Sequence, residues 1–254
     1  MNSRLSQRDE AEIQRSASEA SKSRAAAIPR AELDRYRNPP ADTSFALEYA
    51  FYLLGDVQGK TVLDLGCGQG ENTVPLIERG SKVLAIDISP ELIAITQQRL
   101  REANLQADVS VGSAYETGIP DASVDVIFCM SLIHHLDIRM VREEMRRILR
   151  PGGVVILKEP IRFSKTYAWL RNMLPAQEDI SDFEHPLTRE ELSIMTESFQ
   201  EEGTRYFRLP FVPLIARAVP ATTEAAWRAS GWALQKLPGL DRFATTIVTR
   251  LRKP

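Results

Sequence analysis

The chain has 254 residues, of which 43% are hydrophobic and 26% charged, and its formal net charge is −2. This composition is typical of a soluble globular protein, and the length suffices for one large core with additions. No apolar run approaches the ~20 residues of a membrane-spanning helix, and the polar first thirty residues argue against a secretory signal. Cys67 and Cys129 predict neither a disulfide framework nor a metal cluster, so we expect a cytoplasmic protein.

The charges are unevenly distributed along the chain. Residues 38–204 hold fifteen basic and twenty-six acidic side chains, whereas residues 205–254 hold nine basic and two acidic ones. An acidic central region binds phosphate backbones poorly, and the basic tail lacks a dense tract of Lys and Arg. We therefore expect no nucleic-acid partner.

The N-terminal segment carries little structural signal. Its first 28 residues alternate Ser, Ala, Glu and Arg without an apolar stripe, which predicts disorder or a marginal surface helix. We therefore interpret residues 1–37 as a flexible arm. After the break at Asn38-Pro39-Pro40, the sequence Asp42-Thr43-Ser44 predicts the cap of a helix that carries the apolar residues of 45–54.

A regular alternation of strands and helices follows. Strands are expected at 60–65, 82–87, 109–111, 125–130 and 154–157, and helices at 71–79, 90–103 and 138–149. Ser89 followed by Pro90 predicts a capped helix start, and residues 150–153 predict a turn. The uninterrupted apolar run at 125–130 is typical of a strand buried on both faces. Short links between these elements predict a parallel, doubly wound sheet.

The regular alternation of expected strands and helices ends at Pro160. Apolar residues of 161–235 fall mostly at helical spacing, which predicts a mostly helical insertion. Within it, the basic and proline-broken segment 205–217 fits a solvated edge better than a membrane contact. Residues 243–250 are β-branched and alternating, so we expect 236–254 to complete the core sheet with a last strand.

The most informative feature is a pair of strands that each end in an acid. The run 62–70 contains Asp64 followed by three alternate glycines, and the run 85–89 contains Asp87. Glycines permit positive φ and close approach of a ligand, while the next helix points free N–H groups at it. An acid at the tip of the second strand is where such folds bind ribose hydroxyls. The pair predicts a nucleoside-containing ligand across two strand ends.

The glycine spacing narrows the choice of ligand. Dinucleotide sites use Gly-x-Gly-x-x-Gly, whereas this turn has Gly66-x-Gly68-x-Gly70 and contains no Lys or Arg. The carboxylate of Asp64 would repel a pyrophosphate and attract a cation, such as an amino group or a sulfonium. A tight turn without a ligand is the alternative, which the second acid-tipped strand disfavours.

The segment 62–70 resembles motif I of the class I S-adenosylmethionine-dependent methyltransferases. The resemblance covers about residues 55–160 and includes segments 118–125, 131–136 and 149–153 in the family's order. It is nearest to the small-molecule group typified by ubiquinone and menaquinone C-methyltransferases (methyltransferase type 11). The resemblance implies an α/β fold with a Rossmann-like, mostly parallel seven-stranded sheet. A cofactor-binding core at 38–160 and a substrate-side insertion at 161–235 would then precede the last strand.

The resemblance also implies S-adenosylmethionine as cofactor and S-adenosylhomocysteine as product. Asp64 would face the methionine moiety, Asp87 would bind the ribose hydroxyls, and Ile88 would pack on the adenine. Ser113 departs from the pattern, because many relatives have an acid there. The implied cofactor-binding residues are Asp64, Gly66, Cys67, Gly68, Asp87, Ile88, Ser113, Ala114, Met130 and, on the N-terminal arm, Tyr36.

Methyl transfer from a sulfonium is an in-line displacement, so the protein mainly positions the reactants and excludes water. A general base is needed only if the acceptor loses a proton. The candidates at strand ends are His134, His135 and Glu159. Each fits a structural role as well, the histidines in packing or capping and Glu159 in an ion pair. His185 fits a surface turn, and the three histidines show no metal-ligand spacing.

The sequence therefore favours methyl transfer from S-adenosylmethionine to a small-molecule acceptor. An NAD(P)-dependent Rossmann oxidoreductase is the first alternative, against which stand the glycine spacing and the lack of a Tyr-x-x-x-Lys pair. A non-catalytic protein that binds S-adenosylmethionine is the second. The aromatic and Met residues of 161–235 fit either a pocket for a lipophilic acceptor or ordinary core. The methylated atom and the oligomeric state stay open.

Overall fold

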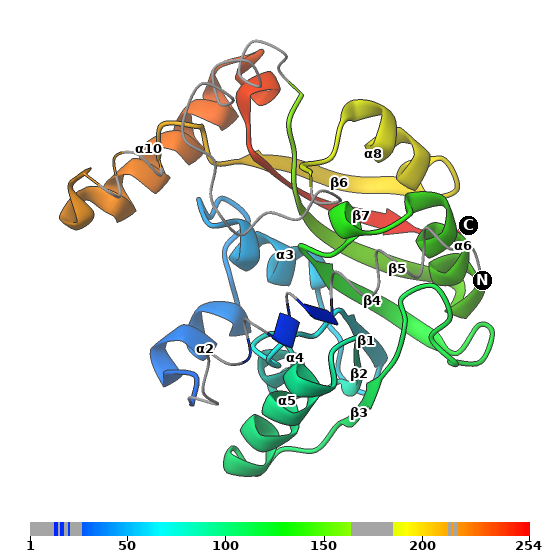
Figure 1. The fold of residues 1–254 in the computed structure, drawn as a ribbon. Helices are drawn as coiled ribbons and strands as arrows, with labels where there is room; N and C mark the ends of the chain where they lie inside the picture. The colour runs from blue at the N-terminus through cyan, green and yellow to red at the C-terminus, as the bar shows by residue number, and fades with distance from the viewer. Residues whose placement is uncertain are drawn as a thin grey trace.

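The computed structural model describes residues 27–163, 185–212, 215 and 218–254, together with residues 13, 14, 16, 17 and 20. Its centre is a seven-stranded sheet with the order β3-β2-β1-β4-β5-β7-β6 (Figure 1). The strands are β1 (Thr61–Leu65), β2 (Lys82–Asp87), β3 (Asp108–Val111), β4 (Val124–Met130), β5 (Leu149–Pro160), β6 (Gln200–Phe207) and β7 (Thr246–Arg252). The first five strands are parallel, and β7 is antiparallel to both of its neighbours. The predicted α/β fold class is confirmed.

Helices cover both faces of this sheet (Figure 1). They are α2 (Arg30–Arg37), α3 (Ala46–Leu54), α4 (Thr73–Glu78), α5 (Pro90–Glu102), α6 (Ile138–Ile148), α8 (Arg189–Thr196) and α10 (Thr223–Lys236), with 3-10 turns η1 (Ile133–His135), η2 (Pro220–Thr222) and η3 (Leu240–Phe243). No helix in these described ranges is long and apolar enough to cross a membrane.

Alternation along the strands divides the core into two layers, because successive strand side chains point to opposite faces. Val62 and Val126 belong to the layer that contains residues of α3, α4 and α5. Leu63 and Ile127 belong to the layer that contains residues of α6 and α8. Burial of both faces explains why residues 62–63 of β1 and 126–129 of β4 are apolar.

Local signals account for several helix starts. Ser89 accepts a hydrogen bond from the backbone N–H of Leu92 and caps α5, as predicted. The predicted cap of α3 at residues 42–44 is wrong, because α3 begins at Ala46 after an uncapped Phe45. Thr43 instead accepts a hydrogen bond from the N–H of Phe45 and donates its own hydroxyl to Glu48, so it stabilises the approach to the helix.

Three further segments differ from the sequence-based expectation. Residues 150–153 belong to β5 rather than to a turn, and a register shift between Val124 and Val126 accommodates them. Residues 200–207 form the edge strand β6 inside the segment expected to be mostly helical, and residues 164–184 of that segment lie outside the described residues. Residues 30–37, expected in a flexible arm, form α2 because Leu33 and Tyr36 are buried.

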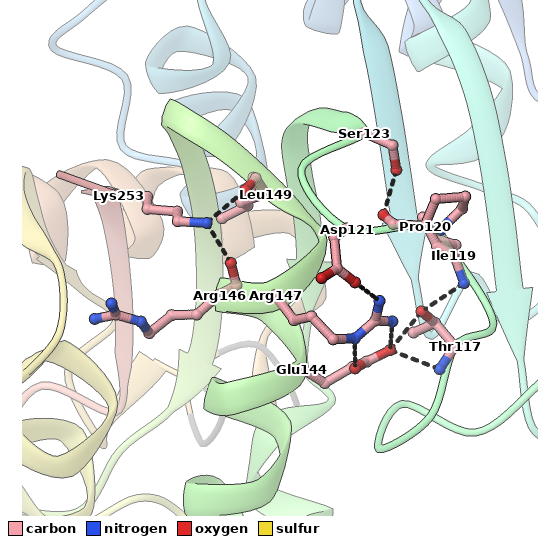
Figure 2. Close-up of polar contacts among 10 residues, drawn as sticks. All are labelled: Thr117, Ile119, Pro120, Asp121, Ser123, Glu144, Arg146, Arg147, Leu149 and Lys253. Carbon is pink, nitrogen blue, oxygen red and sulfur yellow. Dashed lines mark hydrogen bonds and ion pairs between the residues drawn. The ribbon is translucent and has the colours of Figure 1, made fainter.

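A polar cluster attaches the link before β4 to α6 (Figure 2). Glu144 accepts hydrogen bonds from the N–H and hydroxyl of Thr117, at 2.8 and 2.6 Å, and from the guanidinium of Arg147. Burial raises the pKa of Glu144, but these hydrogen bonds outweigh burial and leave the pKa below its ordinary value. At the end of the same helix, Lys253 donates to the carbonyls of Arg146 and Leu149. These contacts fix β4 and β5, whose far ends carry the predicted catalytic candidates.

Candidate functional site

The glycine turn after β1 is folded over the end of β2. The N–H groups of Gly66 and Cys67 both donate to the carbonyl of Ile86, at 2.8 and 3.0 Å. The φ angles of Gly66, Gly68 and Gly70 are 72°, 54° and 78°, which lie in the region that glycine adopts without strain. The conformation of the turn therefore requires its glycines.

The three glycines differ in what lies over them. A Cβ atom at Gly66 would come within 2.8 Å of the side chain of Leu132, and one at Gly70 within 2.8 Å of Thr96. A Cβ atom at Gly68 would have no neighbour within 4 Å. Gly66 and Gly70 therefore serve packing, whereas the space over Gly68 allows a ligand to approach the backbone.

Asp87 ties the ends of three strands together. Its Oδ2 accepts the N–H of Gly68 at 2.9 Å, and its Oδ1 accepts the N–H of Ser89 at 3.0 Å. Its carbonyl accepts the N–H of Gly112, which begins the loop after β3. The structure thus brings together Asp87, the glycine turn and the 112–114 segment, as the sequence predicts for neighbouring strand ends.

The residues predicted to contact adenine lie after the ends of β2 and β3. Ser113 Oγ accepts a hydrogen bond from the N–H of Tyr115 at 3.2 Å, so the hydroxyl already serves the local turn. Ile88, which follows Asp87, and Ala114, which follows Ser113, are both half-buried. The contacts of Ile88, Ser113 and Ala114 with a ligand stay predictions.

Asp64 is 1% exposed and lies inside β1, beneath the turn. Its Oδ2 accepts the hydroxyl of Thr73 at 2.6 Å. Burial raises the pKa of Asp64 to about 7, which the bond from Thr73 opposes and the charge of Asp87 supports. Burial also raises the pKa of the Cys67 thiol within the turn, so this thiol stays protonated. A cation near Asp64 would favour its ionised form.

Two residues of α5 hold the glycine turn by hydrogen bonds. Neither of them was identified from the sequence. The hydroxyl of Thr96 donates to the carbonyl of Gly68, and the Nε of Arg99 donates to the carbonyl of Gln69, each at 2.8 Å. Thr96 is fully buried and Arg99 is 6% exposed. Polar residues three apart on the buried face of an otherwise amphipathic helix are the signal that identifies such contacts.

The predicted catalytic candidates meet at the ends of β4 and β5. Glu159 Oε1 accepts the N–H groups of Leu132 and Ile133, each at 2.9 Å, and its Oε2 lies 2.8 Å from Nδ1 of His134. The ring centroids of His134 and His135 are 3.9 Å apart. Glu159, which is 1% exposed, therefore attaches the η1 turn to the end of β5.

These contacts indicate different roles for Glu159, His134 and His135. Three hydrogen bonds engage the carboxylate of Glu159, which fits an anchor better than a proton acceptor. An ionised carboxylate only accepts, so Nδ1 of His134 donates and the lone pair of the neutral ring lies at Nε2. A general-base role for His134 or His135 stays a prediction.

Other sequence-predicted residues lie in different surroundings. The ring of Tyr36 stacks on Phe51 with centroids 4.8 Å apart, and its hydroxyl lies 3.4 Å from Glu32 on the same helix. Burial raises the pKa of Tyr36 to about 12. His185 is half-exposed, 3.5 Å from Glu191. These contacts give Tyr36 a packing role between α2 and α3, and a cofactor contact for it stays a prediction.

The match to known families falls on this part of the chain. A family model described as methyltransferase domain matches residues 63–157. Residues 63–157 are therefore similar to methyltransferase domains. The matched region contains the glycine turn, Asp87 and the η1 turn, and it ends two residues before Glu159.

Curated relatives match slightly less than half of the chain. An uncharacterized methyltransferase of Mycobacterium tuberculosis is 36% identical over 114 residues, which is 45% of this chain and 45% of that protein. A ubiquinone biosynthesis O-methyltransferase of Xanthomonas oryzae pv. oryzae is 31% identical over 115 residues, which is 44% of this chain and 48% of that protein. The matched region thus spans about half the length of these curated relatives.

Solved structures share the fold of the matched region and of its flanking segments. A geranyl diphosphate C-methyltransferase from Streptomyces coelicolor has a TM-score of 0.58 at 20% identity, covering 81% of this chain and 76% of that one. A SAM-dependent methyltransferase from Aquifex aeolicus has a TM-score of 0.56 at 16% identity, covering 89% and 100%. The cyclase SpnF has a TM-score of 0.58 at 18% identity, covering 81% and 79%. At these identities the likeness concerns the fold alone.

Proposed function

We propose that the protein transfers a methyl group from S-adenosylmethionine to a small-molecule acceptor. The observation that carries this proposal is the open space over Gly68, beside a carboxylate that the N–H of the same residue orients. The similarity of residues 63–157 to methyltransferase domains supports it. S-adenosylmethionine would supply a methyl group already activated on a sulfonium, and S-adenosylhomocysteine would be the product.

The residues of the turn suit this cofactor better than a dinucleotide. Asp87 would accept the two ribose hydroxyls, and Gly68 would let the backbone contact the bound nucleoside. Asp64 places a carboxylate beneath a turn whose residues 66–70 include no Lys or Arg. An anionic pyrophosphate would be repelled there, whereas a cationic amino group would be attracted.

A proton acceptor is needed only for acceptors that lose a proton on methylation. We assign that role to Nε2 of His134, because the bond between Nδ1 and Glu159 fixes the orientation and the tautomer of the ring. Glu159 is then a positioning residue. His135, whose ring lies against that of His134, would exclude water from the same place.

The finer features of the proposal rest on sequence and composition. The acidic character of residues 38–204 favours a small molecule over nucleic acid as acceptor. A lipophilic acceptor and a cytoplasmic location are further expectations. Fold alone does not decide the chemistry, since a structural neighbour is named a cyclase. A protein that binds the cofactor without methyl transfer is therefore the second candidate.

Calorimetry with S-adenosylmethionine, S-adenosylhomocysteine and NAD tests the proposal. We expect both sulfur nucleosides to bind and NAD not to bind. Asp87→Ala should weaken this binding by about 1.5–3 kcal/mol, which is roughly tenfold to 150-fold, because charge-assisted hydrogen bonds are lost. The matched control is Glu91→Ala, which removes a nearby exposed carboxylate that bonds the hydroxyl of Ser89.

Each other outcome has a defined meaning. Binding of NAD without S-adenosylmethionine would overturn the proposal in favour of an oxidoreductase. Unchanged affinity in Asp87→Ala would refute the ribose role of Asp87. Tight cofactor binding without formation of S-adenosylhomocysteine across a broad panel of acceptors would favour the second candidate.

A further inference from the structure

The segment 209–237 leaves the sheet at the edge where a methyl acceptor is expected. Phe207, which ends β6, pairs with Thr246 of β7, and Thr246 pairs with Pro160 at the end of β5. Met130 ends β4 at the same edge. Ligands of open α/β sheets bind outside the carboxyl ends of the strands. The segment therefore begins beside the proposed acceptor site, and Figure 1 shows α10 extending beyond the sheet there.

The chain reverses direction within the 209–237 segment. The N–H of Leu209 donates to Oγ of Ser230 in α10 at 2.8 Å, and Ser230 is 1% exposed. The N–H of Thr222 donates to the carbonyl of Val219 at 2.9 Å, close to the point of reversal. The start of the segment therefore lies beside the second half of α10.

One face of α10 packs on the residues that precede α3. A Cβ atom at Gly231 would come within 2.6 Å of the hydroxyl of Ser44. The ring centroid of Trp227 lies 6.2 Å from that of Phe45. These contacts fix α10 on the molecule and leave its opposite face to the solvent.

Large apolar side chains are exposed along the 209–237 segment. The N–H of Ile215 donates to the carbonyl of Phe211, and the N–H of Val219 donates to the carbonyl of Ile215. This spacing of four places the three side chains, each 37–51% exposed, on one stripe. Trp232 and Leu237 are 60% and 46% exposed. Of the eight large apolar residues exposed in the described ranges, five lie in this segment, so they are concentrated rather than scattered.

Positive charge accompanies these apolar side chains. Arg228 and Lys236 are exposed and lie four residues before and after Trp232, on the same face of α10. Glu224 pairs with Arg228 at 2.8 Å, whereas no carboxylate of the described residues forms an ion pair with Lys236. Residues 208–242 hold five basic and two acidic side chains, in contrast to the acidic excess of residues 38–204. An anionic surface would therefore attract this segment in preference to the rest of the chain.

We propose that the 209–237 segment docks the protein on the surface of an anionic lipid membrane. Elements that lie in a membrane interface combine Trp, Phe and Leu with Lys and Arg, and Trp favours the level of the lipid headgroups. A symmetric dimer through this face would bring two positively charged segments together, which disfavours a second copy of the chain as the occupant.

The inference goes beyond methyl transfer and does not require it. Docking would hold the carboxyl edge of the sheet close to the lipid, where a lipophilic acceptor is concentrated. The sequence favoured a solvated edge for residues 205–217, and the exposed stripe that begins at Phe211 favours the membrane instead.

Sedimentation of the full-length protein with lipid vesicles tests the proposal. We expect vesicles of phosphatidylcholine with about 30% phosphatidylserine to bind the protein about tenfold more tightly than vesicles of phosphatidylcholine alone, and salt should weaken this binding. Trp232→Ser should weaken binding to the anionic vesicles about tenfold, because an apolar anchor is lost. Lys236→Glu should weaken it about thirtyfold, because the substitution reverses a charge.

Two matched controls remove the same chemistry elsewhere on the surface. Tyr52→Ser removes an exposed aromatic side chain of α3, and Lys82→Glu reverses the charge of an exposed lysine at the start of β2. Both variants should bind the anionic vesicles like the wild type.

The fluorescence of Trp232 reports on docking without a loss of binding. Brominated phosphatidylcholine in the anionic vesicles should quench the tryptophan fluorescence of the wild type. Most of this quenching should be lost in Trp232→Phe, which keeps an aromatic anchor and should still bind. Bound wild-type protein without quenching would overturn the proposed orientation on the membrane.

Other outcomes would also overturn the proposal. These are equal binding to the two kinds of vesicle, or affinities of Trp232→Ser and Lys236→Glu that match those of the two controls. A dimer that dissociates in Trp232→Ser, seen by analytical ultracentrifugation in a protein that binds no vesicles, would replace the membrane by a second copy of the chain. Vesicle binding needs no nucleoside, so this proposal and the proposed function can fail separately.

Discussion

Two parts of the same sheet edge are built in different ways. At the ends of β1 and β2, backbone bonds such as those from Gly66 and Cys67 to Ile86 fold the turn, and the carboxylate of Asp87 accepts two further N–H groups. At the ends of β4 and β5, ionisable side chains make the main bonds, with Glu159 engaging the 132–134 segment. A backbone site depends on conformation, so few substitutions preserve it. A side-chain site can change its chemistry through single substitutions.

The two parts also touch. The side chain of Leu132, in the segment that Glu159 holds, lies over Gly66. A change in the η1 turn can therefore reach the glycine turn through this one apolar contact. We therefore expect substitutions at the ends of β4 and β5 to lower the stability of the protein most. Substitutions at Gly68 should lower ligand affinity most.

The largest expected effect is that of Glu159→Ala. The substitution leaves two N–H groups and His134 without their buried partner, so we expect a loss of about 3–5 kcal/mol in the free energy of unfolding. Glu143→Ala is the control, because Glu143 is 64% exposed and pairs with Arg142 at the surface. That control should change stability by less than about 0.5 kcal/mol. Chemical denaturation measures both, and equal effects would contradict the anchoring role of Glu159.

A comparison of Gly66→Ala with Gly68→Ala tests the two parts separately, because each substitution is expected to affect a different property. Both introduce a side chain at positive φ, at a cost of about 1–2 kcal/mol, but only Gly66→Ala also meets Leu132. We expect Gly66→Ala to lose a further ~1–3 kcal/mol of stability from overpacking, part of which Leu132→Ala should restore. Gly68→Ala should instead weaken S-adenosylhomocysteine binding most. Denaturation and calorimetry measure the two effects, and the opposite ranking would refute the assignment of open space to the ligand.

A further effect is a pH dependence carried by Asp64. Its folded-state pKa of about 7 lies above the ordinary value of 3.8, so between these values the folded state holds a proton that the unfolded state has released. Stability should therefore fall as pH rises from about 4 to 7, by at most about 1.4 kcal/mol per pH unit. Asp64→Asn should remove this component, and Asp56→Asn, at an exposed position, should not. Denaturation of the ligand-free protein across this range checks it, and an unchanged slope in Asp64→Asn would contradict the buried-acid interpretation.

Most of the central sheet could be predicted because each strand is indicated by residues that are adjacent in the sequence. The expected strand 82–87 coincides with β2, and Ser89 caps α5 as predicted. The edge strand β6 was missed because it begins Gln-Glu-Glu-Gly and shows no apolar alternation there. Its stability comes from pairing with β7, including contacts of Glu202 with Arg250 and Arg252. A single sequence window does not contain that partner.

The residues of the candidate site also differ in how far the sequence predicted them. Asp87 and the glycine turn were identified because neighbouring residues determine both their spacing and the backbone conformation that they require. Glu159 and His134 were identified as candidates, but their bond to each other was not, since 25 residues separate them. Lys158 was considered only as a partner of Glu159, and the structure instead pairs it with Ser131.

The sequence by itself determined the doubly wound order of elements, the turn that needs glycine at positive φ, and the acid at the tip of β2. These properties follow from periodicity and backbone sterics, which neighbouring residues carry. The tertiary structure decided that Leu132 covers Gly66, that Glu159 anchors the η1 turn, and that Lys158 donates to Ser131. Those contacts depend on the register of strands that are far apart in the chain, and register is set only when the whole sheet is assembled.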